Sequence, residues 1–487
     1  MKNKINIFLI LLLALNYSCS DDSLSEVNID TNTFPVAGDA QILSSAIGYL
    51  GYIVETDLNY SDSFLWSQYY TWGTGVAIGN AERYQTDGGS NDGYWARSYS
   101  NSLADLNYIT KHSSSAAYRG IASVLIAYQF QGLVDHYGDI PFTEALSGAI
   151  EDGSILTPNF DSAETVIYPG LIAMLDEALT DLALAEAGTV GDDDFIFGGD
   201  YAKWTKFANS LKLRILMRTS EKSPQAGAVQ TLISSGTFIE SIDDMPFIPY
   251  TGNTGDQNPM FARAEYGVGM FYYASNASIN LLQDLNDPRA KVIYAVATTG
   301  PFTGFLRGID QGTIDDEPFT ATDTDYSLAS DYAYGEDKPV ILMSPWEVWF
   351  LRAEADARYG TSDDAETAFS TAIELNFNYM EVADPATYIL TLDFAGAANL
   401  DEKLDLIGIQ KWISLNGTQE DEGWIESRRF DRPASRLFTN GIFQNPPLSV
   451  LSTGTVPTAW LYPDSERSLN PNALPQRVIT DLIFWDN

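Results

Sequence analysis

Cys19 is the only cysteine among the 487 residues of this chain, so no disulfide bond can join two segments of the folded protein. Buried apolar side chains must therefore stabilise the fold. The composition permits a large core, because 45% of the residues are hydrophobic and 13% are aromatic. No proline- or serine-rich linker interrupts the chain, and we expect residues 36–487 to form a single domain.

The residues before Cys19 have the pattern of an export signal. Two lysines lie near the N-terminus, residues 7–15 are apolar, and a small residue, Ser18, precedes the cysteine. An apolar run of this length is too short to cross a bilayer. The segment resembles a bacterial lipoprotein signal, which implies removal of residues 1–18 and attachment of lipid to Cys19.

The neighbours of this cysteine refine that interpretation. Asn16 stands where a lipoprotein signal usually has leucine, and a plain secretory signal with an incidental cysteine is the alternative. Asp21 and Asp22 resemble the signal that sends lipoproteins of Bacteroidetes-type bacteria to the outer face of the outer membrane. Residues 19–35 are polar and acidic, and we expect them to form a flexible tether.

The charge of the chain limits its partners. It has 66 acidic and 27 basic residues, which gives a formal net charge of −39. Such a chain is a poor binder of nucleic acid. It also repels anionic polymers unless a local basic pocket overrides the overall field. The composition therefore favours a neutral or cationic ligand.

Apolar residues at helical spacing predict a mainly α fold. Leu171, Leu175 and Leu182 share one helix face, and Asp161 with Glu164 resembles a capping box upstream. Similar patterns predict helices over Gly38–Val54, Tyr94–Lys111, Ala116–Asp135, Lys203–Arg218, Phe271–Leu285, Pro345–Tyr359, Asp364–Asn376 and Glu402–Asn416.

Two stretches, about residues 237–339 and 433–487, are instead rich in Gly, Pro, Asp and aromatic residues. They predict long ordered loops on a helical scaffold, and such loops usually carry function.

One predicted helix pair is similar to a tetratricopeptide unit. Ala353, Ala365, Phe369 and Ala372 occupy the small and aromatic positions through which two helices of such a repeat pack, and Gly360 ends the first helix. An ordinary αα-hairpin explains these residues equally well.

A wider resemblance connects segments along nearly the whole chain, and the chain strongly resembles the SusD/RagB family of Bacteroidetes surface glycan-binding lipoproteins. The segments are Tyr118-Arg119-Gly120, Asp135-His136-Tyr137-Gly138-Asp139-Ile140-Pro141-Phe142-Thr143-Glu144-Ala145-Leu146, the run from Lys203-Trp204 to Arg214, Asn258-Pro259-Met260-Phe261, Asp287-Pro288-Arg289, Met343 to Glu347, Ala353-Glu354-Ala355, Gln410-Lys411-Trp412, Arg428-Arg429, and Leu461-Tyr462-Pro463 with Glu466 and Asn470.

The resemblance implies a SusD-like fold with tetratricopeptide-like helix pairs and a loop-rich face that binds nutrient oligomers. It also implies a SusC-like TonB-dependent transporter as partner, a lipid-anchored position on the outside of the outer membrane, and no catalysis. We expect capture of an oligosaccharide such as a neutral β- or α-glucan. The alternatives are capture of peptides, an all-helical surface glycosidase, and a scaffold that holds partner proteins.

Aromatic residues supply the candidates for ligand contact. Sugars stack their C–H faces on aromatic planes, and Tyr and Trp keep a polar atom for nearby hydroxyls. The segment from Phe64 to Gly75 reads as a short aromatic helix followed by glycines, and a second aromatic set lies near residue 272. The predicted stacking residues are Trp66, Tyr69, Tyr70, Trp72, Tyr272 and Tyr273. The alternative is that these rings form part of the core.

Catalytic and metal sites have little support. His112 and His136 are the only histidines, and we expect both at the surface or in a turn. No thiol remains in the fold, so the residues needed for His- or Cys-based catalysis and for typical zinc sites are missing. The run Asp192-Asp193-Asp194 could bind structural Ca²⁺, but it lacks the alternating ligands of an EF-hand loop. We expect a solvated acidic loop there, no cofactor and no catalytic residue.

Overall fold

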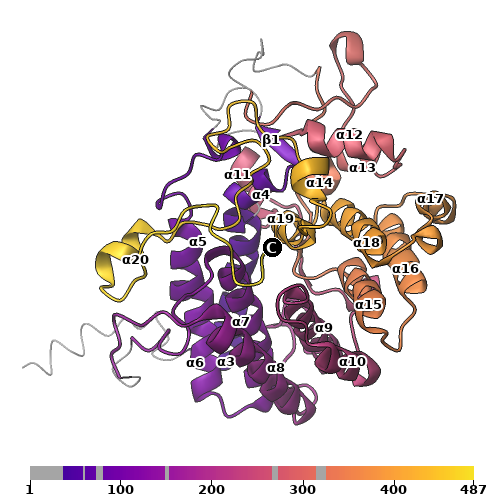
Figure 1. The fold of residues 1–487 in the computed structure, drawn as a ribbon. Helices are drawn as coiled ribbons and strands as arrows, with labels where there is room; N and C mark the ends of the chain where they lie inside the picture. Colours follow the sequence, from indigo (N-terminus) through magenta and orange to yellow (C-terminus); the bar gives the residue numbers. More distant parts are fainter. Residues whose placement is uncertain (1–36, 59–60, 73–79, 149–152, 266–271, 314–324) are drawn as a thin grey trace, which may run out of the picture.

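The computed structural model describes residues 37–58, 61–72, 80–148, 153–265, 272–313 and 325–487, and helices dominate it (Figure 1). The predicted cysteine anchor and tether lie outside these residues. The helices are α3 (Asp39–Tyr52), α4 (Asp62–Trp66), α5 (Asp92–Arg97), α6 (Leu103–His112), α7 (Ala116–Tyr137), α8 (Tyr168–Ala183), α9 (Tyr201–Arg218), α10 (Ala226–Ser235), α11 (Pro259–Arg263), α12 (Asn276–Asp284), α13 (Ala290–Ile293), α14 (Asp331–Tyr334), α15 (Pro345–Tyr359), α16 (Ala365–Tyr379), α17 (Pro385–Leu392), α18 (Leu400–Leu415), α19 (Glu420–Phe430) and α20 (Asp464–Leu469).

Short strands form two small antiparallel sheets in the described part of the chain. Strand β1 (Tyr70–Trp72) pairs with β3 (Tyr272–Ala274), and β2 (Phe247–Ile248) pairs with β4 (Val340–Ile341). π-helical turns cover Ile53–Leu58, Ser98–Ser102, Ala163–Ile167 and Phe438–Ile442, and 3₁₀ turns cover Ala81–Arg83, Ile242–Asp244, Gly300–Phe302 and Phe394–Gly396. The mainly α fold predicted from the sequence is confirmed.

The helices surround a central element, α19 (Figure 1). Helices α3, α6, α7 and α8 form one side of the molecule, α15 to α18 form the other, and α9 with α10 lies between them at the bottom of the view. Strand β1 lies near α12 and α13 at the top. The C-terminal loops run across the face toward the viewer. No described helix is both long enough and apolar enough to cross a membrane.

Helix α15 shows how local sequence sets the boundaries. The Ser344 side chain accepts a hydrogen bond from the amide of Glu347 at the start, where Pro345 occupies the first turn without losing an internal bond. Gly360 ends the helix with a φ of 62°, a left-handed conformation that suits glycine. The predicted range Pro345–Tyr359 matches the structure.

The predicted helix pair is present. Helices α15 and α16 pack closely, and Ala353, Phe369 and Ala372 are fully buried between the packed elements. Arg352 stands where such a repeat prefers an apolar residue, but its guanidinium pairs with the carboxylates of Glu240 and Asp363, at 2.6 Å each. These ion pairs explain how a charged residue is accommodated there.

Helix α19 was not predicted, because six of its eleven residues are charged. All eleven are buried in the structure. Arg218 of α9 pairs with both Glu422 and Glu426, and Arg429 pairs with Glu426 and with Glu354 of α15, at 2.7 and 2.6 Å. A buried charge needs a partner, and Arg218 and Glu354 supply partners from other helices. The helix is therefore stabilised by tertiary ion pairs.

Two local expectations were wrong. The predicted helix over Phe271–Leu285 begins only at Asn276, because Tyr272–Ala274 pairs as a strand with β1 and Ser275 caps the helix. The expected capping box at Asp161 is also absent. Ser162 caps the following turn, and the Asp161 carboxylate accepts hydrogen bonds from the amides of residues 142 and 143.

Candidate ligand-binding surface

The six predicted stacking residues lie on or beside the sheet of β1 and β3. Five of them are buried, and only one is half-buried. Trp66, Tyr69, Tyr70, Tyr272 and Tyr273 each expose 5% of their surface or less, whereas Trp72 is partly exposed. A ring needs an open face to stack on a sugar. The burial matches the core alternative, and the contact of these residues with a ligand stays a prediction.

Tertiary contacts explain this burial. The indole N–H of Trp66 donates a hydrogen bond of 2.9 Å to the carbonyl of Ala81. The ring of Tyr69 lies 4.4 Å from that of Trp412, and its hydroxyl donates to the carbonyl of the same residue. These aromatic side chains join the sheet to the helical core.

The two faces of the sheet have different environments. Trp72 lies opposite Tyr272, and both pack against the main core. On the other face, Tyr273 belongs to a small separate cluster with Ile309 and Tyr326. This cluster lies beneath the loop of residues 297–307. The amide of Ser327 donates to the carbonyl of Arg307 in that loop, and the carbonyl of Ser327 accepts from the amide of Ala274 in β3, each at 2.8 Å.

Exposed aromatic rings gather on that loop. Phe302 is 41% exposed and Phe305 is 67% exposed. The guanidinium carbon of Arg307 lies 4.3 Å from the ring centre of Phe302 and 3.8 Å from that of Tyr326. We call Phe302, Phe305, Arg307 and Tyr326 the aromatic platform.

Hydrogen bonds hold the platform in place. The Arg307 guanidinium donates to Asp325 at 2.6 Å and to the hydroxyl of Tyr326 at 2.8 Å. The amide of Phe305 donates to the carbonyl of Phe302 at 2.9 Å, so both rings belong to one turn. Gly304 in this turn has a φ of 85°, which other residues rarely adopt.

The sequence predicted functional loops over residues 237–339, but the platform residues were not among the predicted ligand contacts. The signal was present, because Phe302 and Phe305 flank a glycine within the run Gly300 to Arg307. Phenylalanines spaced by three residues in a glycine-rich loop have no helix face to pack on, which favours exposure.

A buried carboxylate lies beside the same sheet. Glu82 is fully buried and accepts hydrogen bonds from the Thr71 hydroxyl and from the amide of Trp72, the latter at 2.8 Å. Burial raises the pKa of Glu82 to about 7, although these hydrogen bonds and the nearby Arg83 oppose the rise. Thr71 lies opposite Tyr273 in the sheet, and Tyr273 belongs to the cluster beneath the platform. Glu82 therefore bonds to the strand that pairs with this part of the platform's support.

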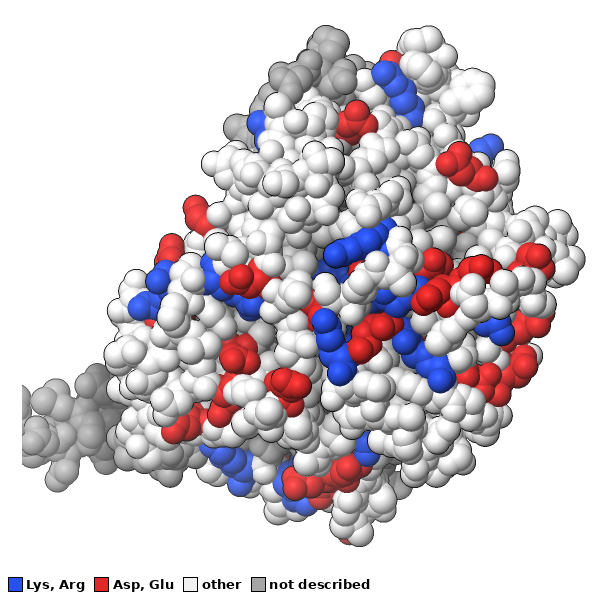
Figure 2. All heavy atoms as spheres, in the orientation of Figure 1, with Lys and Arg blue, Asp and Glu red and all other residues white. Residues whose placement is uncertain are grey.

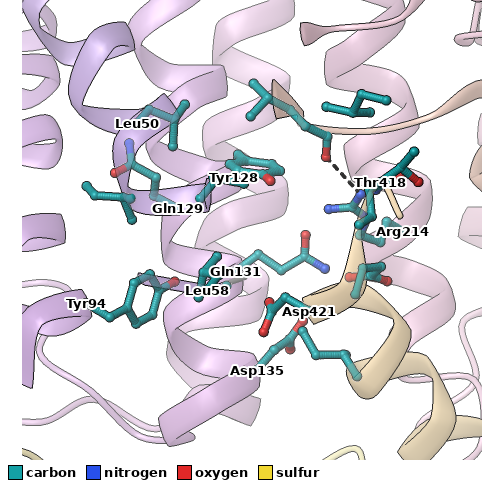
Figure 3. Close-up of a pocket in the computed structure, with 18 residues that line it drawn as sticks. Leu50, Leu58, Tyr94, Tyr128, Gln129, Gln131, Asp135, Arg214, Thr418 and Asp421 are labelled. Carbon is teal, nitrogen blue, oxygen red and sulfur yellow. Dashed lines mark hydrogen bonds between the residues drawn. The ribbon is translucent and has the colours of Figure 1, made fainter. Parts of the chain in front are cut away.

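A small internal cavity of about 50 Å³ lies between α3, α7 and α19 (Figure 3). Gln129, Gln131 and Asp135 of α7 line it, together with Asp421 of α19 and Arg214 of α9. Apolar residues such as Leu50 and Ile53 line it as well, and its volume is too small for a sugar residue. The cavity is therefore part of the scaffold and not a glycan site.

The histidines have different positions. His112 is exposed at the end of α6 and its ring lies 4.4 Å from that of Tyr108. The expectation for His136 was wrong, because this side chain is fully buried. Its ring nitrogens bond to the carbonyl of Gly132 at 2.6 Å and to the Asp421 carboxylate at 2.7 Å, which satisfies both.

The candidate calcium ligands mainly bond to their own surroundings. Asp194 is buried and accepts hydrogen bonds from three loop amides and from the indole of Trp204 at 2.7 Å. Asp193 accepts a hydrogen bond from the Tyr118 hydroxyl at 2.8 Å. Among the described residues, no group of three or more His, Cys, Asp or Glu side chains is arranged to hold a metal ion. Asp194 acts as a structural acceptor, so the expectation of a solvated acidic loop was wrong at this residue.

Comparisons with known proteins agree with the fold. A family model described as "Starch-binding associating with outer membrane", and named SusD-like, matches residues 31–463. A search of curated proteins found no match. A solved structure of a chitin-binding protein has a TM-score of 0.77 and 24% identity, over 92% of this chain and 100% of that one.

Two further solved structures are similar. A chitin-binding SusD homolog from Flavobacterium johnsoniae has a TM-score of 0.76 and 20% identity, over 91% of this chain and 99% of that one. A SusD/RagB family protein from Bacteroides thetaiotaomicron has a TM-score of 0.74 and 23% identity, over 92% and 99% of the two chains. The family is one of binding proteins, which confirms the expectation of a non-catalytic protein. Because the family model covers most of its residues, this chain belongs to the SusD-like family of outer-membrane-associated glycan-binding proteins.

Proposed function

We propose that this protein captures an oligosaccharide at the cell surface and delivers it to a SusC-like TonB-dependent transporter. The aromatic platform carries the proposal, because it presents Phe302 and Phe305 to solvent on a loop stabilised by Arg307. Two of the similar solved structures bind chitin by their titles. A neutral glycan, such as a chitin or glucan oligomer, is therefore the proposed ligand.

The energetics suit a capture protein. If one sugar ring covers about 100 Å² of apolar surface, a coefficient of ~25 cal/mol/Å² gives about 2–3 kcal/mol before ordering costs. Two such contacts yield weak binding to several sugar units in a row. Weak binding suffices when a transporter holds the protein at its entrance, because pairing raises the effective ligand concentration.

The proposed location depends on Cys19. We propose that residues 1–18 are removed, that lipid on the cysteine anchors the protein to the outside of the outer membrane, and that residues 19–35 tether the domain of residues 36–487. The Cys19→Ala variant should leave the outer-membrane fraction while the purified domain keeps its ligand affinity. A variant that still fractionates with the outer membrane would contradict the anchor.

Calorimetry on the purified domain tests the ligand. The panel contains chitohexaose, maltohexaose, cellohexaose and a hexapeptide of mixed sequence. We expect binding of at least one neutral oligosaccharide with micromolar to millimolar affinity. Binding of the peptide alone would favour the peptide-capturing alternative, and release of reducing ends would indicate a glycosidase.

The transporter is tested separately. A chromosomal affinity tag on this protein should co-purify a TonB-dependent outer-membrane barrel after mild detergent extraction. Extraction of the protein without any such barrel would contradict the proposed partner.

A further inference from the structure

A second hollow on the surface differs in chemistry from the aromatic platform. A groove of about 550 Å³ lies beside the end of α19, between residues 436–440, 453–458 and 480–487. We call it the C-terminal groove. In Figure 2, basic and acidic side chains lie side by side near the middle of the face shown, where Figure 1 places α19 and the C-terminal end.

The lining of the C-terminal groove is rich in hydroxyl and amide groups. None of the described residues that line it is aromatic. Asn440 and Thr453 are exposed, and Thr455 and Thr480 are half-buried. Hydroxyl and amide side chains both donate and accept hydrogen bonds, so they match the hydroxyls of a sugar without stacking.

The two carboxylates that line the groove are buried and already bonded. Asp431 accepts hydrogen bonds from the amides of Phe438 and Thr439, at 3.0 and 3.1 Å, and from the Thr439 hydroxyl at 2.7 Å. Asp486 is 2% exposed and pairs with Arg428 at 3.3 Å. Burial raises the pKa of Asp486 to about 6, although Arg428 opposes the rise, so its negative charge is partly lost in weak acid.

Among the charged side chains that line the groove, the exposed one is a cation. The side chain of Arg436 is 47% exposed, and its guanidinium lies 3.7 Å from the Asp431 carboxylate, beyond hydrogen-bond distance. Arg428 adds a second, buried guanidinium, which packs 3.8 Å from the ring centre of Trp424. Two arginine and two aspartate side chains line the groove, so their charges balance, whereas the whole chain has a net charge of −39.

We propose that the C-terminal groove binds a sugar unit that carries a carboxylate, that is, a uronic acid residue of a glycan. Arg436 pairs with the carboxylate, because its planar guanidinium matches the two oxygens. The threonine hydroxyls and the Asn440 amide bond to the sugar hydroxyls. The proposal rests on the proposed glycan-binding function and adds an acidic sugar to its ligands.

An acidic sugar can bind in the groove despite the negative net charge of the chain. The overall negative charge repels them at long range, but this repulsion is screened beyond about 8 Å in physiological salt. Inside the groove, the exposed charged side chain is Arg436. A uronic acid is therefore attracted where it makes contact, and repelled on the acidic surface elsewhere.

Calorimetry with trigalacturonate at pH 7 and low salt tests the proposal on the whole domain. We expect binding to the wild-type protein, and an affinity at least about tenfold lower in Arg436→Gln, because a charge-assisted hydrogen bond is lost. Arg467→Gln is the matched control, since Arg467 is 35% exposed and also lies 3.7 Å from an aspartate, Asp464. The double variant Thr453→Val and Thr455→Val should also bind trigalacturonate more weakly than the wild type, although it removes no charge.

Three results would overturn the proposal. They are the absence of trigalacturonate binding to the wild type, equal affinity in Arg436→Gln, and an equal loss in the Arg467→Gln control, which would indicate non-specific charge. Phe305→Ala should leave trigalacturonate binding unchanged while weakening binding of neutral oligosaccharides. Failure of the proposed function would instead appear as no binding of any neutral glycan, so the two failures are distinguishable.

Discussion

The guanidinium of Arg307 lies over the ring of Tyr326, with its carbon 3.8 Å from the ring centre, and donates a hydrogen bond of 2.8 Å to the hydroxyl of the same residue. Tyr326 is 9% exposed and belongs to the cluster beneath the loop. Arg307 thus connects a buried ring to the exposed ring of Phe302. This connection makes the platform a defined surface and allows its role to be tested by substitution.

Phe305→Ala should lower affinity for the bound neutral oligosaccharide by about tenfold or more, because it removes a ring worth roughly 1.5–3 kcal/mol of apolar burial. Stability should change little, since the side chain is 67% exposed. Calorimetry and thermal unfolding measure the two effects. Phe195→Ala is the control, because Phe195 is an exposed phenylalanine, at 46%, outside the loop region of residues 237–339. An equal loss of affinity in both variants would exclude a specific role for the platform.

Arg307→Lys should weaken glycan binding about three- to tenfold. Lysine keeps the charge but lacks the planar guanidinium that lies over Phe302 and Tyr326 and donates to both Asp325 and Tyr326. The loop should become less ordered, and hydrogen exchange of residues 300–307 should increase. Unchanged affinity together with unchanged exchange would show that the stacked guanidinium does not position the platform.

Arg289→Met should destabilise the fold by about 3–5 kcal/mol, because it leaves the buried carboxylate of Asp287 without its cation. Arg289 is fully buried and donates to Asp287 at 2.6 Å, to Gln410 at 2.7 Å and to Asn376 at 2.9 Å. Urea denaturation measures the loss, with Arg467→Met as an exposed control. The pair Asp287→Asn and Arg289→Met should recover part of the loss, and no recovery would contradict the unpaired-charge explanation.

Glu354→Gln should reduce stability in a pH-dependent way. Burial alone would raise the pKa of Glu354, but the guanidinium groups of Arg429 and Arg358 lower it to about 2. The ionised group therefore stabilises the fold fully above its ordinary value of 4.5, and this contribution is lost as the pH falls toward 2. We expect a deficit of about 3 kcal/mol at pH 7 that shrinks below pH 4, measured by urea denaturation. A deficit that is constant with pH would have another cause.

Glu82→Gln should instead increase the stability of the protein at high pH. With its pKa raised to about 7, Glu82 binds a proton more tightly in the folded state, so its contribution to stability falls as the pH rises from 4.5 through 7. Glutamine imitates the neutral form. The variant should match the wild type near pH 5 and exceed it by about 2–3 kcal/mol at pH 8, seen as a higher Tm. A variant less stable than the wild type at pH 8 would show that the carboxylate is needed in its charged form.

The fold was largely predictable from local patterns, but the positions of the aromatic rings were not. The segment around Trp66 and Tyr70 has the same sequence whether its rings lie in the core or at the surface. Burial was decided by pairing with Tyr272–Ala274, some 200 residues away, and by the ring of Trp412. Local periodicity cannot report a partner strand that distant.

The sequence by itself determined the helices with one apolar face, such as α8 and α15, because burial of a periodic stripe follows from the spacing of the side chains. It also determined the family, through segments spread along the chain. Only the tertiary structure decided that the charged helix α19 lies at the centre and that Phe302 and Phe305 face solvent. The physical reason is that a charge is buried, or a ring exposed, according to the partners that distant elements bring to it.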